Sequence, residues 1–112
     1  MEDVRITRAV AAVLYVFVED VGAQRHGYEL MRLTAFPSGK IYPILARLLA
    51  AGWLEATMEH IDPVKEARPP RRLYRLSERG ITRARQGLAA FYQEIAPARP
   101  SSQLLRPEGR LA

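Results

Sequence analysis

Apolar residues recur every three or four positions in several segments of the chain, the pattern of helices that bury one face. The first segment, residues 7–20, is apolar on more than one side, which predicts burial against two surfaces. The second covers residues 27–34, and the third begins near Ser38, a residue type that caps helices, and ends before Gly52. Because a short turn separates the last two, they predict a helix-turn-helix. In the helix predicted over residues 27–34, the residues expected on the buried side are Tyr28, Leu30 or Met31, and Leu33.

The pattern changes after Gly52. Residues 53–60 and 72–76 predict two strands of a hairpin, and the proline-rich, basic residues 61–70 predict the loop between them. Ser77 begins a last helix that reaches about Ile95. We therefore predict a mainly α-helical fold with a small β-hairpin, in which residues 1–95 form one domain and its last helix, 77–95, makes a dimer. Residues 96–112 have no sustained period and are expected to form a flexible tail.

Composition narrows the class of protein. The chain has 112 residues and a net charge of +5, which fits one domain with a polyanionic partner. Its cations are almost all arginine, which suits phosphate contacts, although a GC-rich genome explains the same bias. It has no cysteine, which excludes disulfides and thiolate zinc sites and fits the cytoplasm. The apolar run at residues 9–18 is shorter than the ~20 residues that span a bilayer, so no membrane partner is expected.

The third helix has two unlike faces. Ile41, Ile44 and Leu48 share one side, while small, hydroxyl and cationic residues share the other. Such a helix fits a DNA major groove, and a basic hairpin loop beside it reaches phosphates. We therefore predict DNA contacts from Ser38, Gly39, Lys40, Tyr42, Pro43, Arg47, His26, Arg68, Arg71 and Arg72.

Each of these residues also has a simpler explanation. Tyr42 can instead cover its own helix. The lysine and the arginines can simply be solvated. Ser38 and His26 are both at helix starts, where they can serve as caps. Pro69 and Pro70 are expected to stiffen the loop and to hold its arginines outward. Arg75 can instead pair within the chain.

A surplus of apolar surface on the first and last helices favours contact between two subunits. The last helix has apolar residues at spacings of three and four, as in a coiled-coil seam. The alternative is that this seam packs on the first helix of its own chain. The predicted dimer interface consists of Val10, Leu14, Phe17, Ile81, Ala84, Leu88, Phe91 and Ile95.

Four stretches resemble the PadR transcriptional regulators. They are residues 26–31 (His-Gly-Tyr-Glu-Leu-Met), 38–48 (Ser-Gly-Lys-Ile-Tyr-Pro-Ile-Leu-Ala-Arg-Leu), 51–55 (Ala-Gly-Trp-Leu-Glu) and 69–80 (Pro-Pro-Arg-Arg-Leu-Tyr-Arg-Leu-Ser-Glu-Arg-Gly). The order of the predicted elements is that of a winged helix-turn-helix. The resemblance implies a homodimeric repressor that leaves its operator when an effector binds, often a small aromatic or toxic molecule. Two copies are expected to place two recognition helices about one turn of DNA apart, which matches a pseudo-palindromic site. The chain is similar to the short form, in which the last helix makes the dimer.

Some short-form relatives stack drugs on a tryptophan of that helix, whereas this chain offers Phe91 and Tyr92. With Tyr15 they form the candidate effector pocket.

Other classes of function find little support in the sequence. His60 with Glu59 and Asp62 makes a poor metal set, since one histidine in a loop gives no fixed spacing. Neither histidine has an evident partner for a catalytic triad, and no glycine loop suits a phosphate cofactor. We therefore expect no enzyme, metal or cofactor. The alternatives are a winged-helix module that binds another protein and ignores DNA, and an activator or clock-type regulator.

Overall fold

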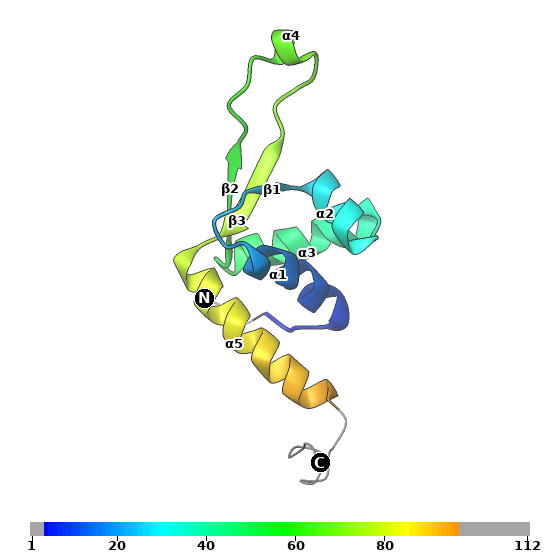
Figure 1. Cartoon of the computed structure of the whole chain (residues 1–112), viewed down its shortest axis with the longest axis vertical. Coiled ribbons are helices and arrows are strands. Elements are labelled where there is room, and N and C mark those ends of the chain that lie inside the picture. Colours follow the sequence, from blue (N-terminus) through cyan, green and yellow to red (C-terminus); the bar gives the residue numbers. More distant parts are fainter. Residues whose placement is uncertain (1–3, 97–112) are drawn as a thin grey trace, which may run out of the picture.

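The computed structural model describes residues 4–96. The predicted tail therefore lies outside the described residues, apart from Ala96. Figure 1 shows a helical body from which a long hairpin leads away at one end and the last helix at the other. The elements are α1 (Arg8–Glu19), β1 (Arg25–His26), α2 (Gly27–Thr34), α3 (Ser38–Ala50), β2 (Leu54–Met58), α4 (Pro63–Glu66), β3 (Arg72–Leu76) and α5 (Glu78–Ile95).

Side-chain caps fix where most of the helices begin. The Thr7 hydroxyl accepts from the Val10 amide at 3.2 Å, and the Ser77 hydroxyl accepts from the Gly80 amide at 2.9 Å. Each bond satisfies an amide that lacks a partner within its helix. At α3, however, the cap position is Pro37, which has no side-chain bond to offer, and Ser38 is already helical. The expectation that Ser38 caps α3 is therefore wrong.

The sheet has three antiparallel strands in the order β1-β3-β2. Its main pairing sets Leu54 opposite Leu76 and Met58 opposite Arg72, which confirms the predicted hairpin. The two-residue strand β1 is too short to leave an alternating pattern, and the sequence did not predict it. The predicted loop also contains the single turn α4, because the Asp62 carboxylate accepts from the Val64 and Lys65 amides at 3.0 and 3.4 Å.

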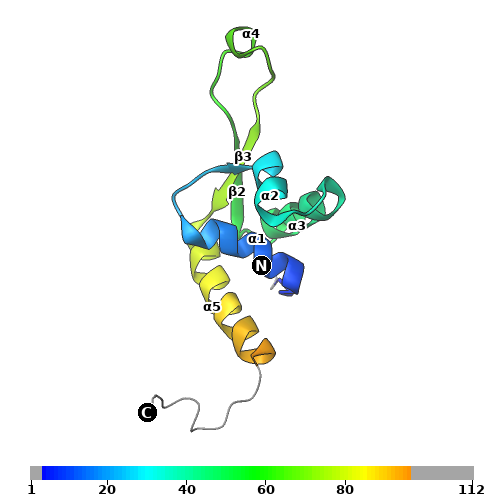
Figure 2. The same ribbon diagram turned by 45° about the vertical axis from the view of Figure 1, so that its right-hand side comes forward.

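One core lies between the helices and the sheet. Helix α1 contacts α5 on one side and α2 and α3 on the other, as Figure 2 shows. A helix that is apolar on two sides is therefore explained within a single chain. The fully buried large side chains are Phe17, Leu14, Leu30, Ile41, Leu45, Leu48, Val10 and Val13.

This core overturns part of the predicted dimer interface. Val10, Leu14, Phe17, Ala84 and Leu88 are each at most 5% exposed, so their own chain already covers them. The seam of α5 packs on α1 of the same chain, which was the alternative. The remaining predicted interface residues are Ile81 and Phe91, which are partly buried against the core, and Ile95, which is 45% exposed.

Candidate nucleic-acid interface

Helix α3 separates its two faces as the sequence predicted. Ile41, Ile44, Leu45 and Leu48 are buried and hold the helix against the core. The opposite face is open to a partner. Every predicted contact residue of this helix is exposed: Ser38, Gly39, Lys40, Tyr42, Pro43 and Arg47.

The start of α3 carries the residues best placed to approach a partner. Gly39 has open space where a side chain would stand, so the backbone there is uncovered. The Lys40 ammonium lies 4.6 Å from the centre of the Phe36 ring, a cation–π contact that keeps the charge near this end. Arg47 lies in the last turn instead, where a cation also interacts favourably with the helix dipole.

Tyr42 extends from α3 to the first turn of α2. It is 45% exposed, and its ring lies so close to Gly27 that a side chain at position 27 would overlap it. Gly27 is therefore needed for the close approach of the two helices, whatever its backbone conformation. Tyr42 both covers part of its surroundings and offers a ring and a hydroxyl to the surface.

Tyr42 is one wall of a surface hollow of about 190 Å³, which we call the interface hollow. Residues from β1, α2, α3 and β3 meet there, although some of them are far apart in the sequence. The lining consists of His26, Gly27, Tyr28, Tyr42, Arg71, Arg72 and Tyr74. Four of these, His26, Tyr42, Arg71 and Arg72, were predicted to contact DNA.

Tyr28 was expected on the buried side of α2, but it is 66% exposed, and Leu33 is 48% exposed. Only Leu30 of the expected set is fully buried, because α2 is short and touches the core along a narrow line. Tyr28 was not predicted as part of the interface. Tyr74 was expected to pack in the core or hairpin, and it does, at 4% exposed, while it also lines the hollow. An aromatic residue within an apolar pattern looks the same whether it faces inward or outward.

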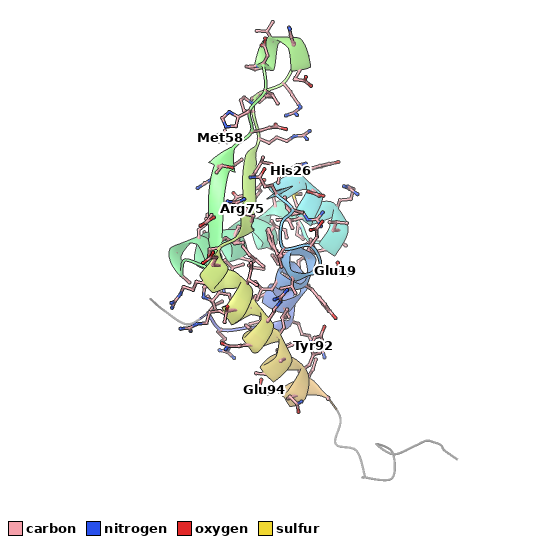
Figure 3. All side chains as sticks on the ribbon, turned by 60° about the vertical axis from the view of Figure 1, so that its left-hand side comes forward. Glu19, His26, Met58, Arg75, Tyr92 and Glu94 are labelled. Carbon is pink, nitrogen blue, oxygen red and sulfur yellow. The ribbon has the colours of Figure 1, made fainter. Side chains whose placement is uncertain are left out.

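His26 joins the hairpin to the helical body, as Figure 3 shows. Its Nδ1 accepts from the Glu29 amide at 3.2 Å, so it caps α2, one of the two roles considered for it. Its Nε2 lies 3.4 Å from Nη1 of Arg71. The Arg72 guanidinium lies 5.6 Å from the Tyr74 ring centre. Cations from the hairpin are thereby held beside the start of α2 and the exposed face of α3.

Arg68 is directed elsewhere. Its Nη1 and Nη2 donate to the two carboxylate oxygens of Glu59 at 2.8 and 3.1 Å. The expectation that the prolines hold Arg68 outward is therefore wrong, because an acidic residue nine positions earlier binds it. Arg75 likewise lies 3.5 Å from Glu55, the pairing within the chain that was its alternative.

The three aromatic residues proposed as an effector pocket do come together. The Tyr15 and Tyr92 rings pack edge to face with centres 5.8 Å apart, and the Phe91 and Tyr92 rings are 6.3 Å apart. A hydrogen bond with Tyr15, then burial, raises the pKa of Tyr92. Tyr15 and Tyr92 remain 48% and 42% exposed. Phe91 also lines a hollow of about 440 Å³ between Arg5 and Ile6, which precede α1, and other residues of α5.

Known proteins identify the class to which this arrangement belongs. Residues 13–86 match the model of the transcriptional regulator PadR-like family. The chain belongs to this family. It is therefore a DNA-binding transcriptional regulator rather than an enzyme, as the sequence predicted. The comparison with curated proteins gives no match.

Solved structures of PadR-like and related regulators share the winged-helix fold. A PadR-like regulator from Bacillus cereus is 20% identical over 78% of this chain and 82% of its own, with a TM-score of 0.58. A PadR family regulator from Eggerthella lenta is 22% identical over 78% of this chain and 77% of its own, with a TM-score of 0.62. Apo MarR from E. coli is 22% identical over 81% of this chain and 58% of its own, with a TM-score of 0.61. These likenesses confirm the predicted fold.

Two further observations hold for residues 4–96, the part of the chain that the structure describes. No helix in this stretch is both long and apolar enough to cross a membrane. In the same stretch, no three histidine or carboxylate side chains are grouped to hold a metal ion.

Proposed function

We propose that the protein is a cytoplasmic, dimeric repressor that binds a pseudo-palindromic operator and leaves it when an effector binds. One observation carries the DNA-binding geometry: the interface hollow joins the exposed face of α3 to the hairpin arginines and to the cap of α2. A helix for the major groove and cations for the flanking phosphates thus lie on one side of the molecule.

In this proposal the start of α3 enters the major groove. Gly39 allows close approach, and Lys40 and Tyr42 contact base edges or the sugar-phosphate backbone. Arg71 and Arg72 neutralise phosphates beside the groove. Arginine suits this role because its planar guanidinium forms paired hydrogen bonds with phosphate oxygens.

In this proposal the dimer interface is the aromatic and aliphatic surface that a single chain leaves exposed. Tyr15, Tyr92 and Ile95 are each between 42% and 48% exposed, and Phe91 lies beside them. For such a dimer to bind a pseudo-palindromic operator, its two α3 helices must lie about 34 Å apart, one turn of B-DNA. An effector bound among these rings would change that spacing and thereby lower affinity for the operator.

The experiment is a selection of bound fragments from random duplexes, followed by anisotropy titrations at several salt concentrations. We expect two half-sites about 10 base pairs apart and a steep loss of affinity with salt. The double variant Lys40→Ala, Arg72→Ala should bind more weakly while its unfolding curve is unchanged.

The matched control is Arg8→Ala, Arg85→Ala, which removes the same charge from exposed positions on α1 and α5. Equal losses in the two double variants would show that only net charge matters. If duplex DNA does not bind at low salt, the alternative of a protein-interaction module replaces the proposal.

A further inference from the structure

An acidic residue, Glu59, lies at the base of the hairpin loop, just after the last residue of β2. Its carboxylate accepts from Nη1 and Nη2 of Arg68 at 2.8 and 3.1 Å and from the Arg71 amide at 3.1 Å. Its own amide donates to the Arg71 carbonyl at 2.8 Å. Glu59 therefore binds both Arg68 and Arg71, which lie where the loop returns to β3.

The loop connecting β2 and β3, residues 59–71, has no other element than the single turn α4 to hold it in shape. The regular pairing ends at Met58 opposite Arg72, so Glu59 and Arg71 are the first pair beyond it. The bonds of Glu59 extend the hairpin by this one pair. They fix where the chain re-enters β3, immediately before the arginines of the interface hollow.

Those arginines depend on that point of entry. The Arg71 side chain reaches His26, which caps α2, and Arg72 lies over Tyr74. A long side chain keeps many rotamers unless its backbone and its contacts hold it. Fixing the backbone at Arg71 therefore reduces the entropy that both arginines would lose on meeting a phosphate.

We propose that Glu59 is a positioning residue for DNA binding: a carboxylate that increases affinity for a polyanion by holding Arg71 and Arg72 at the interface hollow. Arg68 is its counter-ion and not a phosphate contact. This inference rests on the proposed function, and it reverses the expectation from net charge. Removing one carboxylate raises the net charge from +5 to +6, which by long-range electrostatics alone strengthens DNA binding.

The test compares Glu59→Gln with Glu66→Gln. Both variants lose one negative charge from the same loop. Glu66 is exposed on α4, at the far end of the hairpin in Figure 1, and it acts on Arg68 through its charge. We expect Glu59→Gln to raise the Kd for duplex DNA about threefold to tenfold, as for a lost charged hydrogen bond, and Glu66→Gln to leave it unchanged or lower it. The salt slope of Glu59→Gln should fall by about one, the share of one lost phosphate contact.

A double-mutant cycle separates the two roles of Arg68. If Arg68 serves only Glu59, then Arg68→Gln reproduces the loss and the double variant loses no more than either single variant. If Arg68 contacts phosphate, the losses add, and the assignment of Arg68 is overturned. Glu59→Gln binding as tightly as Glu66→Gln overturns the proposal for Glu59.

Hydrogen exchange in the free protein provides a readout that needs no DNA. The Arg71 amide should exchange faster in Glu59→Gln than in the unmodified protein, while core amides of α1 remain protected. Unchanged exchange at Arg71 overturns the positioning role even if DNA affinity falls. If the unmodified protein does not bind DNA, the proposed function itself fails, whatever the exchange result.

Discussion

Helix α3 and the hairpin with its connecting loop supply the two halves of one interface, yet they are built by different means. In α3, the same helical period that directs Ile41 and Leu48 to the core directs Lys40 and Tyr42 to the surface. Its orientation is fixed by burial of apolar side chains, which is large and non-directional. The hairpin loop has no buried residue between Pro63 and Glu66 and depends on polar contacts around Glu59.

This difference shows that one surface can combine a helix held rigidly by core packing with a flanking loop that can adapt. Packing fixes α3 to within the tolerance of a close-packed core. Partly exposed ion pairs such as Glu59–Arg68 are weaker and leave the loop able to adapt. Variants in the two regions should therefore fail in different ways: loss of folding for the buried side of α3, and loss of affinity alone for the loop.

The largest effect is expected inside α3. Leu48→Ala removes a fully buried side chain and should lower the free energy of unfolding by about 2–5 kcal/mol. Arg47→Ala, one residue earlier and exposed, should leave it unchanged. Urea unfolding followed by the fluorescence of Trp53, the one tryptophan, measures both. Similar unfolding curves for the two variants would contradict the division of α3 into a structural and a contact face.

A smaller effect is expected where α3 meets α2. Gly27→Ala introduces a methyl group into the space of the Tyr42 ring, so the ring must move out of the interface hollow. We expect Kd for DNA to rise about fivefold, equivalent to a lost contact of roughly 1 kcal/mol, with little change in stability.

Gly22→Ala is the matched control, because position 22 has open space and lies outside the interface hollow. Anisotropy titration of both variants is the measurement. Equal affinity of the two alanine variants would show that Tyr42 covers the helix without contacting DNA.

The sequence predicted α3 well because its information is local. The apolar period lies within the segment, and the Gly52 stop follows the helix directly, where Gly52 has a positive φ of 79°. The strand β3 was predicted over its full length for the same reason. The position of Ser38 was wrong by one residue because Pro37 can occupy a cap position without a side-chain bond.

The hairpin loop was predicted less well because its contacts are not local. The charge pattern of residues 59–72 shows several arginines, but only the fold shows that Arg68 returns to Glu59. The predicted dimer interface was wrong at its buried residues for a related reason. An apolar stripe on α5 indicates that something covers it, and the sequence does not distinguish α1 of the same chain from a second copy.

The smallest expected effect concerns pH and the loop. The hydrogen bonds from Arg68 and then the Arg71 amide lower the pKa of Glu59 from 4.5 to about 2. Since the folded pKa lies below the ordinary one, the pairing contributes stability above pH 4.5 that is lost as pH falls toward 2. DNA affinity between pH 5 and 8 should therefore not depend on Glu59 titration. In urea unfolding, the difference between the unmodified protein and Glu59→Gln should be larger at about pH 6 than at about pH 2.5. The difference is small because solvent still reaches the pair and screens it. A difference that stays constant across this range would indicate that the carboxylate charge does not hold the loop.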